Sequence, residues 1–567
     1  MSEHNMADYE SLRAEFEWDD IYAEADWDAP DRLNVGHEVC DRHADDRGQV
    51  ALYYVGTDGE REALTFWQLR DRSNRFANVL SELLEPGERV FSYMPRIPEH
   101  YVALVGALKA GMVWGSVNER FGPDGISYRL DDCDAKVVVT TLENLETVER
   151  AIEDAPSVEE IVVVDRDGAG ATFQAAMADA TTREDEIDFY EAMADASREF
   201  DTVETGGEDD ALLYYTSGTT GLAKGVRHKH RWVAGVAATQ RYAVDLQPGD
   251  CYWSTGDLGW LTGPINTLGA WFWGATMLTY EGEFDPEAWA DILDEYPVTV
   301  LFSVPTAYRM LREQESVLDG VSLDLRHALS IGEPLSAGVV EWGEDTLGVT
   351  IHDTYGQTET GNMIVNNYPT MELRPGSMGK PLPGIEAAVV DPDTGEVLEP
   401  GETGEIAQRG DYPCFFAGYW QQPEKTADCF VDGPDGEWYL SGDLGHLDED
   451  GYFWFEGRAD DVILSAGYRI GPFEVESSLG EHEAVAEAAV VPKPHRERGN
   501  IVKAYVVLSE GTEPSDELKE DMQTHVKEEL SAHEYPREIE FVDELPKTVT
   551  GKIRRTELRD RTTDPTS

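Results

Sequence analysis

A run rich in glycine and hydroxyl groups follows a short apolar segment near the middle of the chain. The apolar segment is 211–215 (ALLYY), and the run after it reads TSGTTGLAKG from Thr216 to Gly225. Glycines let the backbone approach a ligand closely, and their N–H groups can face phosphate oxygens. Lys224 adds a positive charge, although the Gly-Lys-Ser/Thr of a Walker A loop is absent. The sequence predicts phosphate binding at the carboxyl end of a strand, with a flexible Gly/Thr linker as the alternative.

Two further polar segments could complete a nucleotide site. The first is HDTYGQTETG (352–361), in which a carboxylate beside hydroxyls suits Mg²⁺ carrying nucleotide phosphates. The second is YLSGDLG (439–445), followed by 451–461. There Asp443 could accept hydrogen bonds from ribose hydroxyls, and Arg458 could pair with phosphate. Taken one at a time, a polar turn and a hairpin with surface charges are the alternatives.

A basic cluster lies near the end of the chain. Lys547, Lys552, Arg554 and Arg555 fall within one short stretch of an otherwise strongly acidic sequence. Gly551, directly before Lys552, makes a mobile tip that suits a side chain reaching into an active site. A solvated basic patch is the alternative.

The elements that must position these residues follow an α/β pattern. Short apolar runs alternate with amphipathic stretches, which favours layers of helices on mostly parallel strands. The apolar runs are 135–140, 160–164, 211–215, 298–304, 327–331 and 349–353, and the amphipathic stretches include 286–295 and 306–318.

The pattern changes twice toward the end of the chain. Turn signals become frequent after about residue 385, which indicates a β-rich subregion over about 385–459. Beyond it we expect strands at 488–491 and 502–508 and a helix at 515–531. The predicted fold class is therefore α/β, with a large N-terminal domain (1–459) and a small mobile α+β C-terminal domain (460–567).

The charge of the chain is extreme. Its 567 residues contain 45 Lys+Arg against 113 Asp+Glu, a formal net charge of −68 spread along the whole sequence. Such a field repels nucleic acid and anionic membranes. Self-repulsion also opposes compaction unless salt screens it, to a Debye length of about 3 Å at 1 M. Only 12 of the basic residues are Lys. We expect a halophilic protein that works in a salt-rich cytoplasm.

Other features limit where the chain can reside. The five cysteines are scattered without a CxxC pair, so neither a disulfide framework nor a zinc knuckle is expected. The acidic N-terminus lacks the apolar core of a signal peptide. The segment 258–280 carries no charge, but Pro264, Asn266 and four glycines interrupt it. We expect a buried core or pocket wall there rather than membrane insertion.

Together, these segments in this order resemble the adenylate-forming superfamily of acyl-CoA synthetases, peptide-synthetase adenylation domains and luciferases. Within it the chain is most similar to medium-chain acyl-CoA synthetases of the acetyl-CoA synthetase-like branch, through GRADDVILSAGYRIGPFEVE (457–476). The resemblance implies an AMP-forming ligase that uses ATP, Mg²⁺ and coenzyme A, in a pathway such as fatty acid metabolism. A carboxylic acid and ATP would give acyl-AMP and pyrophosphate, and acyl transfer to coenzyme A would give acyl-CoA and AMP.

The resemblance also implies roles for single residues. Lys552 would be the catalytic lysine of adenylation, Thr358 would lie near the α-phosphate, Glu359 would hold Mg²⁺, and Asp460 would be the hinge between the domains. The residues placed around the nucleotide are Thr216, Ser217, Gly218, Thr219, Thr220, Gly221, Lys224, Gly332, Glu333, Pro334, Asp353, Thr354, Tyr355, Gly356, Gln357, Asp443 and Arg458. The residues placed at coenzyme A are Ala466, Gly467, Tyr468, Arg469, Arg498, Lys527, Tyr535 and Arg537.

The identity of the acid depends on one position. Acetate-specific relatives close the acyl pocket with a tryptophan where this chain has Gly356, so we expect an open space there. Trp260, Trp271 and Trp273 of the uncharged segment would form an apolar wall. The expected substrate is an acid larger than acetate, either a short- or medium-chain fatty acid or an aryl acid.

Two other functions compete with this one. A stand-alone adenylation enzyme would load a carrier protein instead of coenzyme A, and the residues around Arg469 favour coenzyme A. A non-catalytic nucleotide-binding regulator would have a damaged lysine motif, whereas Lys552 and Glu359 are both present.

Overall fold

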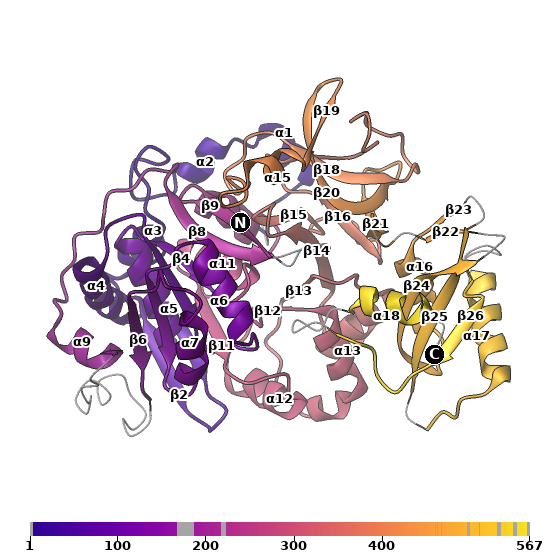
Figure 1. Cartoon of the computed structure of the whole chain (residues 1–567), viewed down its shortest axis with the longest axis horizontal. Helices are drawn as coiled ribbons and strands as arrows, with labels where there is room; N and C mark the ends of the chain where they lie inside the picture. Colours follow the sequence, from indigo (N-terminus) through magenta and orange to yellow (C-terminus); the bar gives the residue numbers. More distant parts are fainter. Residues whose placement is uncertain are drawn as a thin grey trace.

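A computed structural model of the chain describes residues 4–166, 186–216, 223–459, 461, 463–465, 468–495, 499–509, 511–529, 535–547 and 553–563. Within these residues the strands form three sheets, and helices cover their faces (Figure 1). Two sheets belong to the larger, N-terminal part, and the third to the smaller C-terminal part at the right of Figure 1. The mixed α/β architecture with a large and a small domain confirms the predicted fold class.

In the described part of the chain, seven strands make up one N-terminal sheet, in the order β7-β6-β5-β3-β4-β8-β9. All neighbours are parallel except β8 and β9, which form an antiparallel pair. The strands are β3 (Arg89–Tyr93), β4 (Val113–Ser116), β5 (Val137–Thr141), β6 (Glu160–Val164), β7 (Ile187–Asp188), β8 (Asp210–Thr216) and β9 (Lys224–Lys229).

The second sheet continues from parallel strands into the β-rich part. Its order is β17-β18-β20-β21-β16-β15-β14-β13-β12-β10-β11-β1-β2, with β19 paired to β20. Strands β10 to β14 and β1 are parallel, and the ladder turns antiparallel from β15 onward. The β-rich subregion is therefore an extension of the large sheet. The strands are β1 (Val50–Val55), β2 (Arg61–Thr65), β10 (Cys251–Ser254), β11 (Thr276–Tyr280), β12 (Val300–Ser303), β13 (His327–Ile331), β14 (Ile351–Gln357), β15 (Asn362–Asn366), β16 (Ser377–Pro381), β17 (Glu386–Val390), β18 (Gly404–Arg409), β19 (Phe430–Gly433), β20 (Gly436–Leu447) and β21 (Phe453–Arg458).

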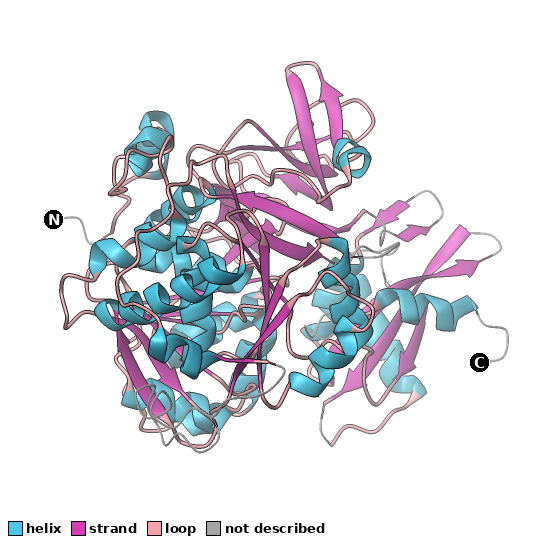
Figure 2. Cartoon of the chain, turned by 60° about the vertical axis from the view of Figure 1, so that its left-hand side comes forward, coloured by secondary structure: helices cyan, strands magenta, loops and turns pink. Residues whose placement is uncertain are grey.

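Helices lie between these two sheets and on their outer faces (Figure 2). In the middle layer α5 packs on β4, whereas α4 packs on β1 and β2 and α11 packs on β10 and β11. Separate apolar clusters fix α6 and α7 on the outer face of the smaller sheet and α12, α13 and α14 on that of the larger one. The helices are α1 (Tyr9–Glu15), α2 (Trp18–Tyr22), α3 (Val35–Cys40), α4 (Phe66–Leu83), α5 (Pro98–Lys109), α6 (Pro123–Asp132), α7 (Leu145–Ile152), α9 (Phe189–Asp195), α10 (Trp232–Tyr242), α11 (Thr262–Phe272), α12 (Pro286–Glu295), α13 (Pro305–Glu313), α14 (Ala337–Trp342) and α15 (Pro423–Ala427).

Local sequence explains where several of these helices begin. Thr65 caps α4 by accepting from the Gln68 N–H, and the Gln68 side chain accepts from the Thr65 N–H in return. Asp285 caps α12, whose first residue is Pro286. The amphipathic stretch expected at 286–295 is this helix, and the uncharged segment 258–280 is α11 followed by β11. No described helix is long and apolar enough to cross a membrane.

The C-terminal sheet has the order β23-β22-β25-β24, with β26 parallel to β25. α16 and α17 cover one face through Val475, Leu479 and Met522, and α18 covers the other through Leu558. The strands expected at 488–491 and 502–508 lie within β24 and β25, and α17 (Asp516–Glu529) covers the described part of the helix expected at 515–531. The elements are α16 (Pro472–Gly480), α17 (Asp516–Glu529), α18 (Arg555–Thr563), β22 (Ile463–Ser465), β23 (Tyr468–Ile470), β24 (Val485–His495), β25 (Gly499–Leu508) and β26 (Glu538–Phe541).

Candidate active site

The predicted phosphate loop joins an antiparallel pair of strands. β8 ends at Thr216 and β9 begins at Lys224, and these two residues pair across the ladder. Thr216 Oγ1 is buried and has no hydrogen-bonding partner among the described residues. A buried hydroxyl without a partner at the edge of this loop fits a ligand oxygen. The intervening predicted residues lie outside the described ones: Ser217, Gly218, Thr219, Thr220 and Gly221.

Lys224 reaches the second predicted segment through one intermediate side chain. Its Nζ donates a hydrogen bond to the Tyr419 hydroxyl (2.8 Å), and that hydroxyl donates to Glu359 Oε1 (2.8 Å). Thr358 and Glu359 follow β14 directly and are both partly exposed. One phenol hydroxyl thus bridges the ammonium of the predicted phosphate loop and the carboxylate expected to hold Mg²⁺.

The metal expected at Glu359 would have few protein ligands. No group of three or more His, Cys, Asp or Glu side chains that could hold a metal occurs in the described part of the chain. Mg²⁺ binds through one or two carboxylates together with substrate phosphates and water. A single partly exposed carboxylate next to a phosphate loop fits that mode of binding, and it does not fit a dedicated all-protein site.

A second polar network connects β14 to the β20–β21 hairpin. Asp443 Oδ2 accepts from the Tyr355 hydroxyl (2.6 Å) and from Gln357 Nε2 (2.5 Å), and Oδ1 pairs with Arg458 Nη1 (2.9 Å). The Tyr439 hydroxyl donates to Gln357 Oε1 (3.1 Å). Asp443 is almost fully buried, so hydrogen bonds from Tyr355, Gln357 and Arg458 replace those that water would make to its carboxylate. Both predicted ribose- and phosphate-contacting residues therefore belong to one network.

Other predicted nucleotide residues lie nearby with different surroundings. Gly332 follows β13 with φ +90°, which favours glycine, and Pro334 comes two residues later. Glu333 Oε2 accepts from Thr306 and Arg309 (2.7 and 2.9 Å). Burial raises the pKa of Asp353 well above its ordinary range.

The side chain of Thr354 bonds to the neighbouring strand of the sheet. Its hydroxyl donates to the carbonyl of Ser330 on the neighbouring strand β13 (2.8 Å), and the residue is buried. The network at Asp443 thus uses the side chains at the end of β14, whereas the hydroxyl of Thr354 stabilises the strand itself. Its contribution at the nucleotide remains a prediction.

The backbone around Gly356 leaves no room for a side chain at this position. A Cβ built there would lie 2.0 Å from the carbonyl oxygen of Asn362 on β15, where the ladder has a register irregularity. A larger side chain is therefore excluded on this backbone, and the expectation of an open acyl pocket beside Gly356 stays a prediction. Glycine is required at this position because β15 approaches β14 so closely.

The three tryptophans expected in the acyl wall contact different partners. Trp260 is partly buried, with its ring 5.8 Å from that of Phe121. Trp271 is fully buried and donates to the carbonyl of Ala51 (2.8 Å), and Trp273 donates to that of Ala237 (2.8 Å). Trp271 and Trp273 therefore anchor α11 and the residue after it to neighbouring elements, and Trp260 remains as a wall candidate.

In the C-terminal part, three of the residues expected at coenzyme A are brought together. Arg537 Nη1 donates to the Tyr535 hydroxyl (2.8 Å), and Lys527 Nζ lies 5.5 Å from the centre of the Tyr535 ring. Tyr468 and Arg469 form β23 by their backbone. The remaining predicted residues lie outside the described ones: Asp460, Ala466, Gly467, Arg498 and Lys552.

Sequence reasoning missed Tyr419, and it gave no role to Tyr439 although this residue opens the YLSGDLG segment. Tyr419 lies in the segment GYW (418–420), which carries no signal of its own. Its position depends on pairing of this segment with β9, since Val226 and Tyr419 form a bridge and Trp420 N donates to Gly225 O (2.7 Å). A long-range pairing of this kind leaves no pattern of residue spacing.

Known protein families and known proteins match this chain along nearly its whole length. Residues 39–420 match the family described as "AMP-binding enzyme", and residues 474–552 match "AMP-binding enzyme C-terminal domain". The chain is 42% identical to acetyl-coenzyme A synthetase of Bacillus subtilis, over 98% of this chain and 95% of that protein. It is 39% identical to the Homo sapiens mitochondrial acyl-coenzyme A synthetase ACSM4, over 94% and 91%. Among solved structures it resembles the Brucella canis acyl-CoA synthetase with a TM-score of 0.75, 37% identity, and coverage of 98% and 99%.

Proposed function

The chain belongs to the AMP-binding enzyme family and is an AMP-forming acyl-CoA synthetase, and on that premise we propose which residues carry each half-reaction. A carboxylic acid and ATP give acyl-AMP and pyrophosphate, after which the thiol of coenzyme A displaces AMP. The observation that carries the assignment is the convergence of Lys224, Tyr419 and Glu359 beside the Asp443 network.

The phosphates of ATP bind at the loop between β8 and β9. Lys224 and the hydroxyl of Thr216 contact phosphate oxygens, together with the residues from Ser217 to Gly221. Thr358 contacts the α-phosphate, and Glu359 holds Mg²⁺. A magnesium ion bound there supplies a positive charge that stabilises the phosphate oxygens of the transition state.

The nucleoside binds against the Asp443 network. Asp443 accepts hydrogen bonds from the ribose hydroxyls, since its Oδ1 has a second lone pair besides the one facing Arg458. Arg458 pairs with a phosphate oxygen, and Gly332 to Pro334 flank the adenine. Tyr355 and Gln357 hold the Asp443 carboxylate in position.

Two residues outside the described part of the chain complete the proposed catalytic cycle. Lys552 offsets the repulsion between the attacking carboxylate and the α-phosphate during adenylation. Rotation about Asp460 then removes Lys552 and brings the coenzyme A residues to the adenylate. The gathering of Lys527, Tyr535 and Arg537 on the C-terminal domain supports a single coenzyme A surface, because two of these side chains carry positive charge that suits phosphate.

The acid is larger than acetate, with an apolar chain or ring that lies against Trp260 and Phe121. The contact between these two rings supports an apolar wall there. Assay of AMP and acyl-CoA release over acetate, propionate, butyrate, hexanoate, octanoate and benzoate tests this assignment in concentrated salt. A clear preference for acetate would contradict it, and formation of no acyl-CoA from any acid would contradict the residue assignment as well.

The working environment is a salt-rich cytoplasm. The net charge of −68 supports this, because only screening removes the self-repulsion of so many carboxylates. Activity and the unfolding midpoint should both rise with KCl up to molar concentrations. A protein equally stable at about 0.1 M and 2 M salt would refute the halophilic assignment.

A further inference from the structure

Tyr419 stands between the two charged groups of the phosphate site. Its hydroxyl accepts from Lys224 Nζ and donates to Glu359 Oε1, both at 2.8 Å. No direct ion pair joins Lys224 to Glu359 among the contacts of the described residues. The hydroxyl therefore bridges an ammonium and a carboxylate that both lie within hydrogen-bonding distance of it and make no direct ion pair within the described part of the chain.

Backbone hydrogen bonds attach the residues around Tyr419 to the segments that carry Lys224 and Glu359. Trp420 N donates to Gly225 O and Arg227 N donates to Gly418 O, which attaches the segment to β9 next to Lys224. On the other side, Phe416 N donates to Glu359 O (3.1 Å). The Tyr419 ring also packs against Phe416. Backbone contacts thus fix Tyr419 relative to both of its charged partners.

Separation of the two charges has a consequence for binding of the nucleotide. A direct Lys224–Glu359 pair would neutralise both groups, and ATP and Mg²⁺ would have to break it before they could bind. A tyrosine hydroxyl titrates at about pH 10, so it carries its proton at neutral pH. A neutral phenol donates to the carboxylate and accepts from the ammonium without cancelling either charge.

We propose that Tyr419 is a positioning residue for adenylation, which keeps Lys224 and Glu359 apart so that each can bind its share of magnesium–ATP. The proposal rests on the assignment of Lys224 to phosphate and Glu359 to Mg²⁺. It predicts that the hydroxyl matters for ATP and Mg²⁺ and has no effect on the acid or on coenzyme A.

The test is Tyr419→Phe, which keeps the ring and removes only the hydroxyl. The KM for ATP and the Mg²⁺ concentration for half-maximal adenylation should rise about 10- to 100-fold, as for loss of hydrogen bonds to charged groups. The KM for the acid should not change, and neither should the rate of acyl-CoA formation from supplied acyl-AMP. Unchanged ATP and Mg²⁺ dependence would overturn the proposal.

The matched control is Tyr412→Phe. Tyr412, seven residues before Tyr419, is a buried tyrosine whose hydroxyl makes no hydrogen bond to Lys224 or Glu359 within the described residues. Its loss should leave the KM for ATP unchanged. A rise equal to that of Tyr419→Phe would show a merely structural effect and overturn the proposal.

A double-mutant cycle keeps the proposal falsifiable if either variant is less stable. Since the hydroxyl acts through Glu359, Tyr419→Phe should raise the KM for ATP less in a Glu359→Gln background than in the wild type. Equal effects in both backgrounds would overturn the proposal. If the wild-type enzyme forms acyl-AMP but Glu359→Gln has normal Mg²⁺ dependence, the assignment of Glu359 fails first, and the positioning role of Tyr419 fails with it.

Discussion

Arg458 Nη1 lies 2.9 Å from Oδ1 of Asp443, directly across the ladder that joins β21 to β20. The other carboxylate oxygen of Asp443 is held by Tyr355 and Gln357. Asp443→Asn should therefore lower kcat/KM for ATP about 10- to 100-fold, because the amide replaces an acceptor by a donor in a buried network. Steady-state kinetics with ATP varied at saturating acid and coenzyme A measures this.

A control variant separates this effect from a loss of stability. Asp448→Asn removes a carboxylate that pairs with Arg374 near the far end of the same hairpin. It should lower the unfolding midpoint without changing the KM for ATP. If both variants change ATP kinetics alike, Asp443 has no special role at the nucleotide.

Lys552→Ala should abolish acyl-AMP formation and leave ATP binding largely intact, because the role proposed for this lysine is to stabilise charge that develops in the transition state. Acid-dependent pyrophosphate exchange and equilibrium binding of ATP measure the two properties. Lys547→Ala is the matched control, since Lys547 lies five residues earlier and pairs with Glu487 (3.0 Å). An alanine variant of Lys552 that adenylates at nearly the wild-type rate would remove the lysine from the mechanism.

Gly356→Ala should destabilise the enzyme by about 1–3 kcal/mol, the usual effect of overpacking. Its Cβ would meet the Asn362 carbonyl oxygen at 2.0 Å, so β14 and β15 must move apart. Unfolding in denaturant at constant high salt measures the change in free energy.

The control for Gly356 is Gly480→Ala. Gly480 is exposed at the end of α16, where a Cβ would meet nothing within 4 Å. Alanine there should be neutral or slightly stabilising. If Gly356→Ala folded normally but accepted only shorter acids, glycine would be acting as a pocket residue after all.

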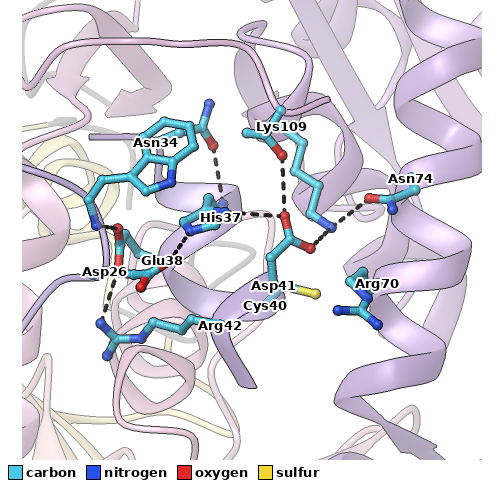
Figure 3. Close-up of polar contacts among 12 residues, drawn as sticks. Asp26, Asn34, His37, Glu38, Cys40, Asp41, Arg42, Arg70, Asn74 and Lys109 are labelled. Carbon is cyan, nitrogen blue, oxygen red and sulfur yellow. Dashed lines mark hydrogen bonds and ion pairs between the residues drawn. The ribbon is translucent and has the colours of Figure 1, made fainter. Parts of the chain in front are cut away.

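His37 lies between two carboxylates in the N-terminal part (Figure 3). Its Nε2 lies 2.8 Å from Asp26 and its Nδ1 3.5 Å from Asp41, and it lines a cavity of about 550 Å³ with Trp27 and Arg70. Burial lowers the pKa of His37, but hydrogen bonds to Asp41 and Asp26 outweigh this and raise it above 6.5.

A raised pKa in the folded state fixes the sign of the pH dependence. His37 contributes its full stability below pH 6.5, the ordinary pKa, and loses it as pH rises through the higher folded value. The stability advantage of wild type over His37→Gln should therefore shrink above pH 6.5. Denaturant unfolding at constant high salt across this range measures the difference. His525→Gln is the control, because its partner is the Ser478 carbonyl, and its effect should not follow the same curve.

Much of the fold could be predicted because it depends on local patterns. The run of valines at 137–139 and the capped stretch at 286–295 specify β5 and α12 without help from distant residues. The loop after β8 could be placed for the same reason, since an apolar strand and glycines lie side by side in the sequence.

The rest of the site depends on which strands become neighbours. The close approach of β15 to Gly356 could not be predicted, because the sequence does not show which strand lies beside it. Tyr419 was not predicted because its backbone pairs with β9, nearly two hundred residues earlier in the chain. In both cases the surroundings of a residue depend on a backbone segment that is distant in the sequence. Residue type and spacing do not predict such a long-range pairing.

The large sheet runs without interruption from β14 through β15, β16 and β21 to β20. Gln357 and Asp443 lie on the first and last of these strands and are joined by a hydrogen bond (2.5 Å). Rotation of a C-terminal domain that begins after β21 would leave this distance unchanged. The sheet thus fixes the groups proposed to bind the nucleoside relative to one another. If that assignment is right, ordering them adds little to the entropic cost of ATP binding, and the same surface would retain acyl-AMP during the second half-reaction.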